Sequence, residues 1–337
     1  MSEPFPIIDV TTWPVIGDEM LGRKPKCWLT TSDGTRWLFK KKSRDNSEDD
    51  WSEKIAGELA ELIGIPHAIV ELAQRFGQRG VISRNLVSIS GEEELILGNS
   101  MLVEADPSYP TGDYYHVAQH TVARVLTVIG ARSVGLPPGT SFGPEVTNGL
   151  DLFIGYLLFD SWIGNTDRHH ENWALIKLVS AQYVLAPSYD HAASLGHNLL
   201  DADRLERLTT RDRNRAIPVY AAKARSAFYR SENDRRAVST DQAFLLAADE
   251  SKIAASYWLA RLRAVNETAA TGILQRVPRE IILRKLSDSS VVHQFRFRII
   301  FRPRPGRSTP PVLRRSTSDS SPQPSARATF GESGAGR

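Results

Sequence analysis

Residues 160–176, DSWIGNTDRHHENWALI, decide how the rest of the chain is interpreted. The apolar stretch 149–163 runs into Gly164, and the loop that follows brings together two histidines, a glutamate and an asparagine. Carboxylate, imidazole and amide groups in such a loop can move protons or bind a cation. The alternative is a capped turn, in which Asn165 and Asp167 only bind backbone groups. The remaining sequence has to distinguish an active-site loop from such a turn.

The spacing of three polar residues favours phosphoryl-transfer chemistry. Asp167 and Asn172 stand five residues apart, which is the D-x-x-x-x-N spacing of a kinase catalytic loop. In that loop the carboxylate accepts the proton of the acceptor hydroxyl, and the amide oxygen holds Mg²⁺. Asp190 follows a predicted two-stranded segment, where kinases carry a second metal-binding aspartate. The spacing of one pair is unspecific, but three residues in this order are moderately specific.

The first hundred residues are rich in strand signals. Residues 27–30 and 36–40 predict a β-hairpin, and Ser32-Asp33-Gly34 supplies its turn. A helix is predicted from about Asp50 to Ile63, ending at Gly64, because its apolar residues recur at helical spacing. Further short strands are expected at 68–73 and 80–90. This region therefore predicts a small sheet with one helix.

Beyond Pro110 the pattern becomes mostly helical. Ser239 and Gln242 form a predicted capping box for the last of these helices. Asp113 is a candidate cap for the first helix. The expected helices cover 114–128, 149–163, 202–230 and 239–265, and short strands are expected at 173–178 and 183–186. The pattern predicts the α+β fold class. It also predicts a strand-rich domain at 1–100, a helical domain at 101–290 and a tail at 291–337.

Charge and composition exclude several classes of protein. The net charge of the chain is +3, but it is unevenly distributed. The tail, 291–337, has nine arginines and two carboxylates and so carries +7, which leaves about −4 for the rest of the chain. An acidic body argues against nucleic-acid binding by the folded part. The single cysteine, Cys27, excludes an internal disulfide framework. No secretory signal and no membrane-length apolar run are apparent, so we expect a cytoplasmic protein. The Ser-, Pro- and Arg-rich tail predicts disorder, and we favour a dispensable extension over a segment that binds an acidic partner.

A kinase also needs a strand lysine for the ATP phosphates and a helix glutamate that orients it. Lys40 ends the strand 36–40, and Glu53 lies in the first turn of the next helix. Lys41 and Lys42 are alternatives for the lysine, because the strand register cannot be read from three adjacent lysines. A solvated pair of charges is the simpler interpretation of Lys40 and Glu53.

The loop 164–172 followed by YVLAPSYD resembles the HipA-like serine/threonine kinases, whose hallmark is a loop close to G-N-x-D-x-H-x-x-N and then L-x-P-x-Y-D. The residues in pattern are Gly164, Asn165, Asp167, His169, Asn172, Leu185, Pro187, Tyr189 and Asp190. The resemblance covers roughly residues 15 to 230. It implies a two-lobed, protein-kinase-like fold, with Mg²⁺ and ATP as cofactors. It also implies Asp167 as catalytic base, His169 as its supporting residue, and Asn172 and Asp190 as Mg²⁺ ligands.

The resemblance extends to the nucleotide-binding residues of the first domain. Gly22-Arg23-Lys24-Pro25-Lys26 stands where the family's phosphate-covering loop lies, so Gly22 and Lys26 join Lys40 and Glu53 as predicted ATP-binding residues. The extra N-terminal subdomain of the longer toxin-type members is expected to be missing. A protein serine or threonine is the expected acceptor. The resemblance leaves open whether the protein has an inhibitory partner protein, as in toxin–antitoxin systems.

Other functions are compatible with parts of the pattern. Histidines 169, 170 and 191, with Asp167 and Asp190, could form the transition-metal site of a hydrolase. That interpretation leaves Lys40 and Glu53 without a role. A nucleotide-binding pseudokinase and a small-molecule kinase are further alternatives. In the kinase interpretation Arg168, His170 and Glu171 are expected to be exposed loop residues, and His191 and His197 structural or surface groups.

Overall fold

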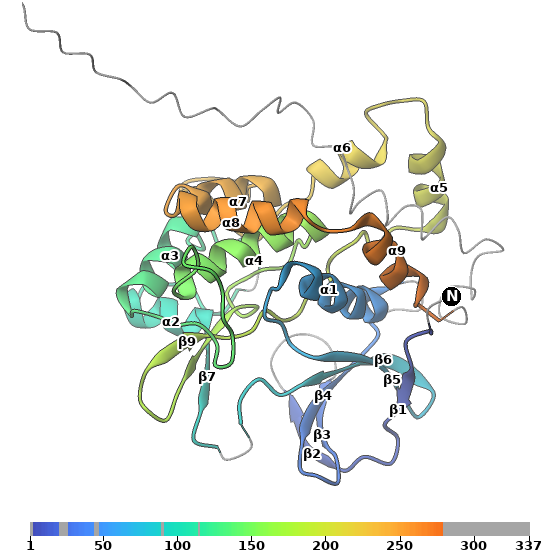
Figure 1. Ribbon diagram of the computed structural model, residues 1–337, viewed down its shortest axis with the longest axis horizontal. Coiled ribbons are helices and arrows are strands. Elements are labelled where there is room, and N and C mark those ends of the chain that lie inside the picture. Colours follow the sequence, from blue (N-terminus) through green and yellow to red (C-terminus); the bar gives the residue numbers. More distant parts are fainter. Residues whose placement is uncertain (1–2, 20–25, 44–46, 89–90, 114, 279–337) are drawn as a thin grey trace, which may run out of the picture. The chain divides into compact units, whose positions relative to one another are not determined.

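The predicted hairpin lies inside a six-stranded sheet. The computed structural model describes residues 3–19, 26–43, 47–88, 91–113 and 115–278, which are coloured in Figure 1. Strands β3 (Lys26–Thr30) and β4 (Arg36–Lys41) pair antiparallel, with Lys26 opposite Lys40. Gly34 takes a positive φ of 83° in the turn between them, a conformation that glycine adopts without steric cost. The hairpin prediction is confirmed.

The strands of this sheet follow the order β1-β5-β6-β4-β3-β2. Only β1 and β5 pair in parallel; the other neighbouring pairs are antiparallel. Alternating side chains point to opposite faces, so Val81 packs with the main core while Ile82 joins a smaller cluster on the other face. The remaining strands of the sheet are β1 (Ile7–Asp9), β2 (Val15–Glu19), β5 (Val70–Arg75) and β6 (Gln78–Arg84).

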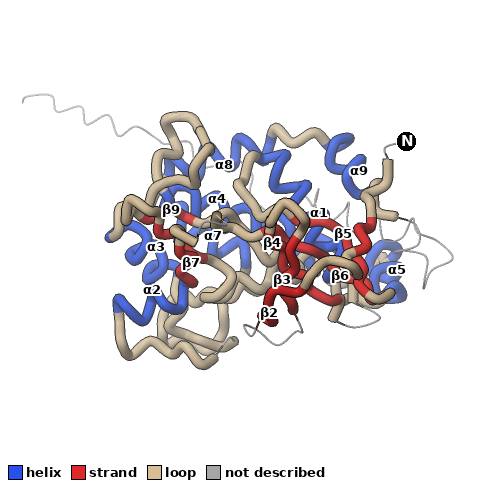
Figure 2. Tube along the Cα trace, turned by 90° about the horizontal axis from the view of Figure 1, so that it is seen from below, coloured by secondary structure: helices blue, strands red, loops and turns tan. Residues whose placement is uncertain are grey.

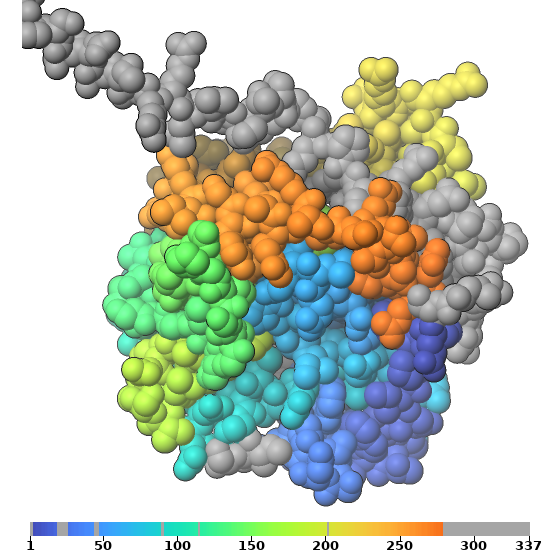
Figure 3. All heavy atoms as spheres, viewed as in Figure 1, coloured from blue at the N-terminus to red at the C-terminus, as the bar shows by residue number. Residues whose placement is uncertain are grey.

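Helix α1 (Asp49–Ile63) packs on β5 and β6 and is buried on nearly all sides. Gly64 ends it in a left-handed conformation, and its N–H binds the carbonyls of Ala60 and Glu61. Two helices near the end of the described chain, α8 (Lys252–Arg263) and α9 (Glu267–Gln275), cover α1, and their orange surface lies against its light-blue surface in Figure 3. The end of the described chain therefore stabilises the strand-rich half.

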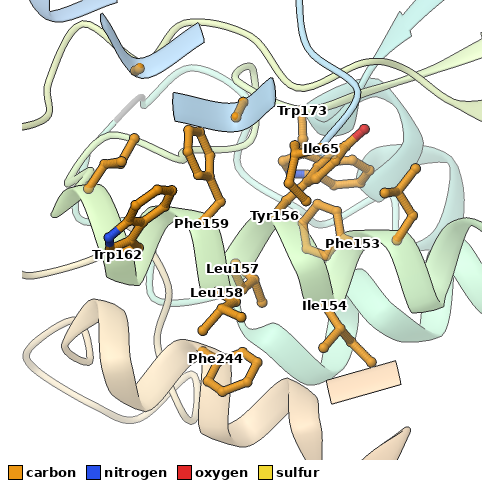
Figure 4. Packing of buried hydrophobic residues seen from close by; sticks show 14 of the residues in the cluster. Ile65, Phe153, Ile154, Tyr156, Leu157, Leu158, Phe159, Trp162, Trp173 and Phe244 are labelled. Atoms are coloured by element: carbon orange, nitrogen blue, oxygen red, sulfur yellow. The ribbon is translucent and has the colours of Figure 1, made fainter. Parts of the chain in front are cut away.

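Helix α4 (Gly149–Ile163) is the centre of the helical half. Asn148 caps its N-terminus by accepting a hydrogen bond from the N–H of Asp151. Its apolar side chains point in all directions: in Figure 4, Phe153 and Phe159 lie on one side of the helix, while Leu158 on the other side faces Phe244 of α7 (Thr240–Ala248). Because neighbours cover α4 on all sides, it fixes the position of the loop that begins at Gly164.

The chain after the loop that begins at Gly164 enters a second sheet, which has three strands. This sheet has the order β7-β8-β9, with antiparallel pairs formed by β7 (Glu94–Leu97), β8 (Ala174–Lys177) and β9 (Tyr183–Leu185). Figure 2 shows the strands of the two sheets as two separate groups, the smaller one beside α2 (Gly98–Ala105) and α3 (Val122–Ala131). Strands β8 and β9 connect the two segments that carry Asp167 and Asp190.

Three helix predictions need correction. The helix expected from Tyr114 begins at Val122 as α3 (Val122–Ala131), because Thr121 caps it and His116 has a positive φ of 65° upstream. The single helix expected over 202–230 is two short ones, α5 (Asp201–Thr209) and α6 (Ile217–Ala222). The helix expected over 239–265 ends at Ala248, and Ser251 caps a new one, α8. The capping box of Ser239 and Gln242 is confirmed.

The fold class predicted from the sequence is confirmed: a strand-rich N-terminal region is followed by a helical C-terminal region. Along the described stretches, no helix combines the length and the apolar character needed to cross a membrane. The predicted tail, 291–337, lies outside the described residues.

Candidate active site

The loop after α4 is held by hydrogen bonds from its own polar residues. Gly164 ends α4 with a φ of 66°, and the Asn165 amide donates to Asp160 Oδ1 at 2.8 Å. The N–H of Asp167 donates to Asn165 Oδ1, and Asn172 Nδ2 donates to the carbonyl of Asp167 at 2.7 Å. Because the Nδ2 of Asn172 is used in this way, its amide oxygen is the group that can bind a cation.

A buried ion pair anchors the loop to α4. Arg168 donates to both carboxylate oxygens of Asp160, at 2.8 and 2.7 Å, and to the carbonyl of Asn172 at 3.0 Å. Its Nη2 also reaches Ser188 Oγ at 2.9 Å. The guanidinium therefore ties α4, the loop and the segment before Asp190 together.

Two exposure predictions for this loop were wrong. Arg168 and His170 are each only 1% exposed. Arg168 is buried because Asp160 compensates its charge, and His170 because Nδ1 of its ring is hydrogen-bonded to the Tyr109 hydroxyl at 2.9 Å. Glu171 is half-buried. The sequence signal that could have indicated the ion pair is Asp160 itself, a carboxylate near the end of a mostly apolar helix.

Asp190 is presented from a second constrained segment. Its φ of 56° lies in the left-handed region, which non-glycine residues seldom occupy and which recurs at functional sites. On either side, Ser188 Oγ is hydrogen-bonded to His191 Nε2 at 2.7 Å, and the Tyr189 hydroxyl donates to the carbonyl of Glu171 at 2.7 Å. As expected, His191 is a buried structural group, 2% exposed.

The strand-rich half contributes Lys40 from β4 and Glu53 from α1. The Lys40 ammonium lies 3.1 Å from Glu53 Oε1 and 3.4 Å from Asp190 Oδ1. Burial by itself lowers the pKa of Lys40, but the attraction of Asp190 and Glu53 outweighs it and raises the pKa above its ordinary value. Lys40 is therefore a fixed cation that connects the two halves of the site.

The neighbouring lysines, Lys41 and Lys42, also line the space around Lys40, but in different settings. Lys41 is exposed, as strand alternation requires for the residue after Lys40. Partial burial lowers the pKa of Lys42; the carboxylate of Asp50 opposes this effect, and the guanidinium of Arg79 adds to it. Of the three lysines considered from the sequence, Lys40 is the one placed between Glu53 and Asp190.

One cavity of about 730 Å³ collects these residues. It is bounded by β3, β4 and α1 on one side and by the loop 166–172 and the segment 189–193 on the other. The predicted site residues that line it are Lys26, Lys40, Glu53, Asp167, His169, Asn172 and Asp190. Gly22 lies outside the described residues. All the described residues predicted for the site therefore face the same space.

His169 is a neutral group in this arrangement. Burial lowers the pKa of its imidazole to about 4, although the nearby carboxylate of Asp190 partly opposes this effect. Its Nδ1 accepts a hydrogen bond from the N–H of Glu171 at 3.2 Å, which is a contact inside the loop. These contacts suit a residue that shapes the loop around Asp167.

The side chains that could bind a metal ion in the cavity allow a comparison with the metal-dependent hydrolase considered from the sequence. Within the described part of the chain, no three or more His, Cys, Asp and Glu side chains are grouped so that they could hold a metal ion. Asn172 and Asp190 instead offer one amide and one carboxylate group to the cavity. Such a sparse set of hard oxygen ligands suits Mg²⁺ that is also bound by phosphates and water.

Comparisons with known proteins bear on the fold. No family model matches the chain, and no curated protein matches its sequence. The proinflammatory kinase CtkA of Helicobacter pylori is similar in structure, with a TM-score of 0.62 and 17% identity over 88% of this chain and 93% of CtkA. HipA of Shewanella oneidensis, solved with HipB and its operator DNA, gives a TM-score of 0.54 and 13% identity over 86% of this chain. The match spans 65% of the HipA chain. The chain therefore has a kinase-like fold.

Proposed function

We propose that this protein is a HipA-like kinase, which transfers the γ-phosphate of ATP to the hydroxyl of a protein serine or threonine. One observation carries the proposal: the Lys40 ammonium contacts both Glu53 and Asp190, while Asp167 and Asn172 line the same cavity. A charge pair at the surface would not need this arrangement, because solvent would screen it. A kinase needs all five groups together.

Each residue then has a definite task. Lys40 presents a positive charge to the nucleotide phosphates, and Glu53 keeps that charge in place. Lys26, opposite Lys40 on β3, adds a second cation at the edge of the cavity. Asn172 and Asp190 would hold Mg²⁺, which neutralises phosphate charge when bound. In this assignment Gly22 belongs to a phosphate-covering loop.

Asp167 performs the proton transfer. Its carboxylate orients the acceptor hydroxyl and takes its proton while the oxygen–phosphorus bond forms. The bond between the γ-phosphorus and the bridging oxygen breaks, and ADP leaves. The hydrogen bond from Asn172 to the Asp167 carbonyl fixes the distance between the base and the proposed metal ligand. Catalysis therefore rests on positioning and charge stabilisation.

Incubation of the purified protein with γ-labelled ATP, Mg²⁺ and a protein extract tests this function, with Asp167→Asn as the matched control. We expect label on serine or threonine residues with the wild type and none with the variant. Mapping of the labelled residues separates protein acceptors from small-molecule alcohols. Tight ATP binding without transfer would identify a pseudokinase and contradict the proposal.

A further inference from the structure

A second cavity, of about 420 Å³, adjoins the catalytic loop. Tyr115, Thr166 and His169 line both this cavity and the one that holds Lys40. Thr166 and His169 stand on either side of Asp167 in the sequence, and Thr166 is exposed. A molecule in the second cavity would therefore lie beside the catalytic loop and next to the proposed nucleotide site.

The far wall of this second cavity is cationic. Arg225, Arg235 and Arg236 line it, and all three are exposed. Arg225 donates to the carbonyl of Ala237, and none of the three forms an ion pair with a described carboxylate. The surrounding segment, 223–237, carries five Lys and Arg residues against two carboxylates. Of these carboxylates, Glu232 is paired with Arg124, which leaves a net positive wall.

The inner wall is different in character. Val117 and Tyr229 are buried there, 6% and 4% exposed, and they give the cavity an apolar floor. His170 also lines the cavity, and its Nε2 is buried without a hydrogen-bond partner among the described residues. An uncompensated buried polar atom is costly, and a ligand that donates to or accepts from it would remove that cost.

From these observations we infer that the second cavity is the acceptor subsite, and that it selects a serine or threonine flanked by acidic side chains in an extended peptide. This inference rests on the proposed function, because Asp167 must act on the acceptor hydroxyl. Several exposed guanidinium groups along one wall suit a chain with several carboxylates, since each can bind one in a bidentate manner. The hydroxyl then lies over Thr166, next to Asp167.

The chain contains serines of its own in a basic sequence context. Residues 313–321, LRRSTSDSS, contain candidate acceptors, but two arginines precede them. Repulsion between these arginines and the cationic wall makes this peptide a poor ligand. It is therefore a natural basic control for an acidic peptide.

The experiment measures peptide binding and phosphoryl transfer separately. Fluorescence anisotropy without nucleotide compares a peptide with serine between glutamates, its glutamine analogue and the peptide 313–321. We expect the acidic peptide to bind wild-type protein roughly tenfold more tightly than the neutral analogue at low salt. Transfer from labelled ATP should show the same order of preference in kcat/KM.

The variants test the assigned residues. Arg235→Gln/Arg236→Gln should abolish the preference, and Arg235→Glu/Arg236→Glu should reverse it in favour of the basic peptide. Arg225 is left in place because it binds the Ala237 carbonyl. Arg211→Gln/Arg213→Gln, two exposed arginines that do not line the cavity, is the matched control and should keep the preference. Melting temperatures confirm that each variant is folded.

The outcomes distinguish this inference from the proposed function. Equal binding of the acidic and neutral peptides to the wild type would overturn the acidic subsite, even if ATP-dependent transfer occurs. Tighter binding of a single-stranded RNA, lost in the same variants, would overturn the peptide as ligand. A charge-dependent peptide preference with no phosphoryl transfer to any acceptor would support the subsite and refute the kinase assignment.

Discussion

At the residue scale, strand alternation distinguishes Lys40 from its neighbours. Successive side chains of β4 point to opposite faces, so Lys40 reaches Glu53 and Asp190 while Lys41 is exposed. The sequence showed that a strand lysine was present, but three adjacent lysines concealed which one points inward. Only the register of β4 against β3 and β6 resolves this.

We expect Lys40→Met to lower phosphoryl transfer by roughly 10²–10³-fold, because the phosphates lose a fixed charge in a partly buried cavity. Lys41→Met, its matched control, should stay within about threefold of the wild type. Steady-state kinetics measure both, and circular dichroism confirms the fold. Similar losses in the two variants would show that the assignment of Lys40 is wrong.

Asp167 and Asp190 should behave differently when each is replaced by asparagine. Asp167→Asn removes the base, so transfer should stop while Mg-ATP affinity is kept. Asp190→Asn removes a metal-binding carboxylate, so both transfer and Mg²⁺-dependent ATP binding should weaken. Calorimetric titration with ATP, with and without Mg²⁺, separates the two. If both variants lose ATP binding and also melt at a lower temperature, the two aspartates are structural.

At the element scale, the ion pair of Asp160 and Arg168 joins α4 to both catalytic segments. The sequence predicted α4 and the loop correctly, because an apolar run ending in glycine is a strong local signal. It did not predict this ion pair, because arginine in a polar loop is expected to be exposed. The sequence does show Asp160 in the preceding helix, but that Arg168 is its partner becomes visible only when loop and helix pack together.

Arg168→Gln should lower the free energy of unfolding by roughly 3–5 kcal/mol, because Asp160 is left buried without its partner. The double variant Asp160→Asn/Arg168→Gln should cost less than the sum of the single changes, since no uncompensated charge remains. Urea denaturation measures these values. Arg215→Gln, in an ion pair whose side chains are 60% and 44% exposed, is the control and should cost less than about 1 kcal/mol. Additive effects would contradict a coupled pair.

The helices that were misplaced share a cause at this scale. Periodicity located the apolar faces of α3, α7 and α8, but single capping residues decide where helices begin. Thr121 and Ser251 were not recognised as caps, because serine and threonine are also common inside helices and loops. Boundaries were therefore less accurate than the existence of the elements.

At the scale of the whole molecule, a buried neutral histidine makes stability depend on pH. His120 is 1% exposed and its Nε2 accepts a hydrogen bond from Trp173 Nε1, while its Nδ1 lies 3.1 Å from the Ala227 carbonyl. Burial lowers the pKa of His120 from 6.5 to about 3. The unfolded chain therefore binds a proton below pH 6.5 that the folded chain does not take up, and acid favours unfolding.

Between pH 7 and pH 5 this histidine should lower the free energy of unfolding by about 2 kcal/mol. His120→Gln keeps a donor and an acceptor without the titration, so its stability should fall less steeply over the same range. Urea denaturation at several pH values compares the two slopes. Parallel slopes would show that His120 does not titrate on unfolding.

The domain boundaries at residues 100 and 290 remain a prediction. The structure adds that the two ends of the described chain are in contact. The N–H of Phe5 binds the carbonyl of Arg276 at 2.7 Å, and the Arg276 guanidinium lies 4.1 Å from the Phe5 ring. The sequence could not predict that the end of α9 contacts the residues before β1, because such a contact has no local signal. Truncation before Val291 should leave folding and ATP turnover within about twofold, because polar, low-complexity sequence buries little apolar area. Differential scanning calorimetry and turnover measurements check this, and a marked loss of either would move the domain boundary.

The position of α9 on α1 also sets the order of events on the ribosome. Translation delivers α1 about two hundred residues before α9, which corresponds to roughly 10–40 seconds of synthesis. During that interval the nascent strand-rich half lacks the cover that α8 and α9 give to α1. Lys40 and Glu53 are therefore synthesised early, but the helix that carries Glu53 gains its cover only after α9 has been translated.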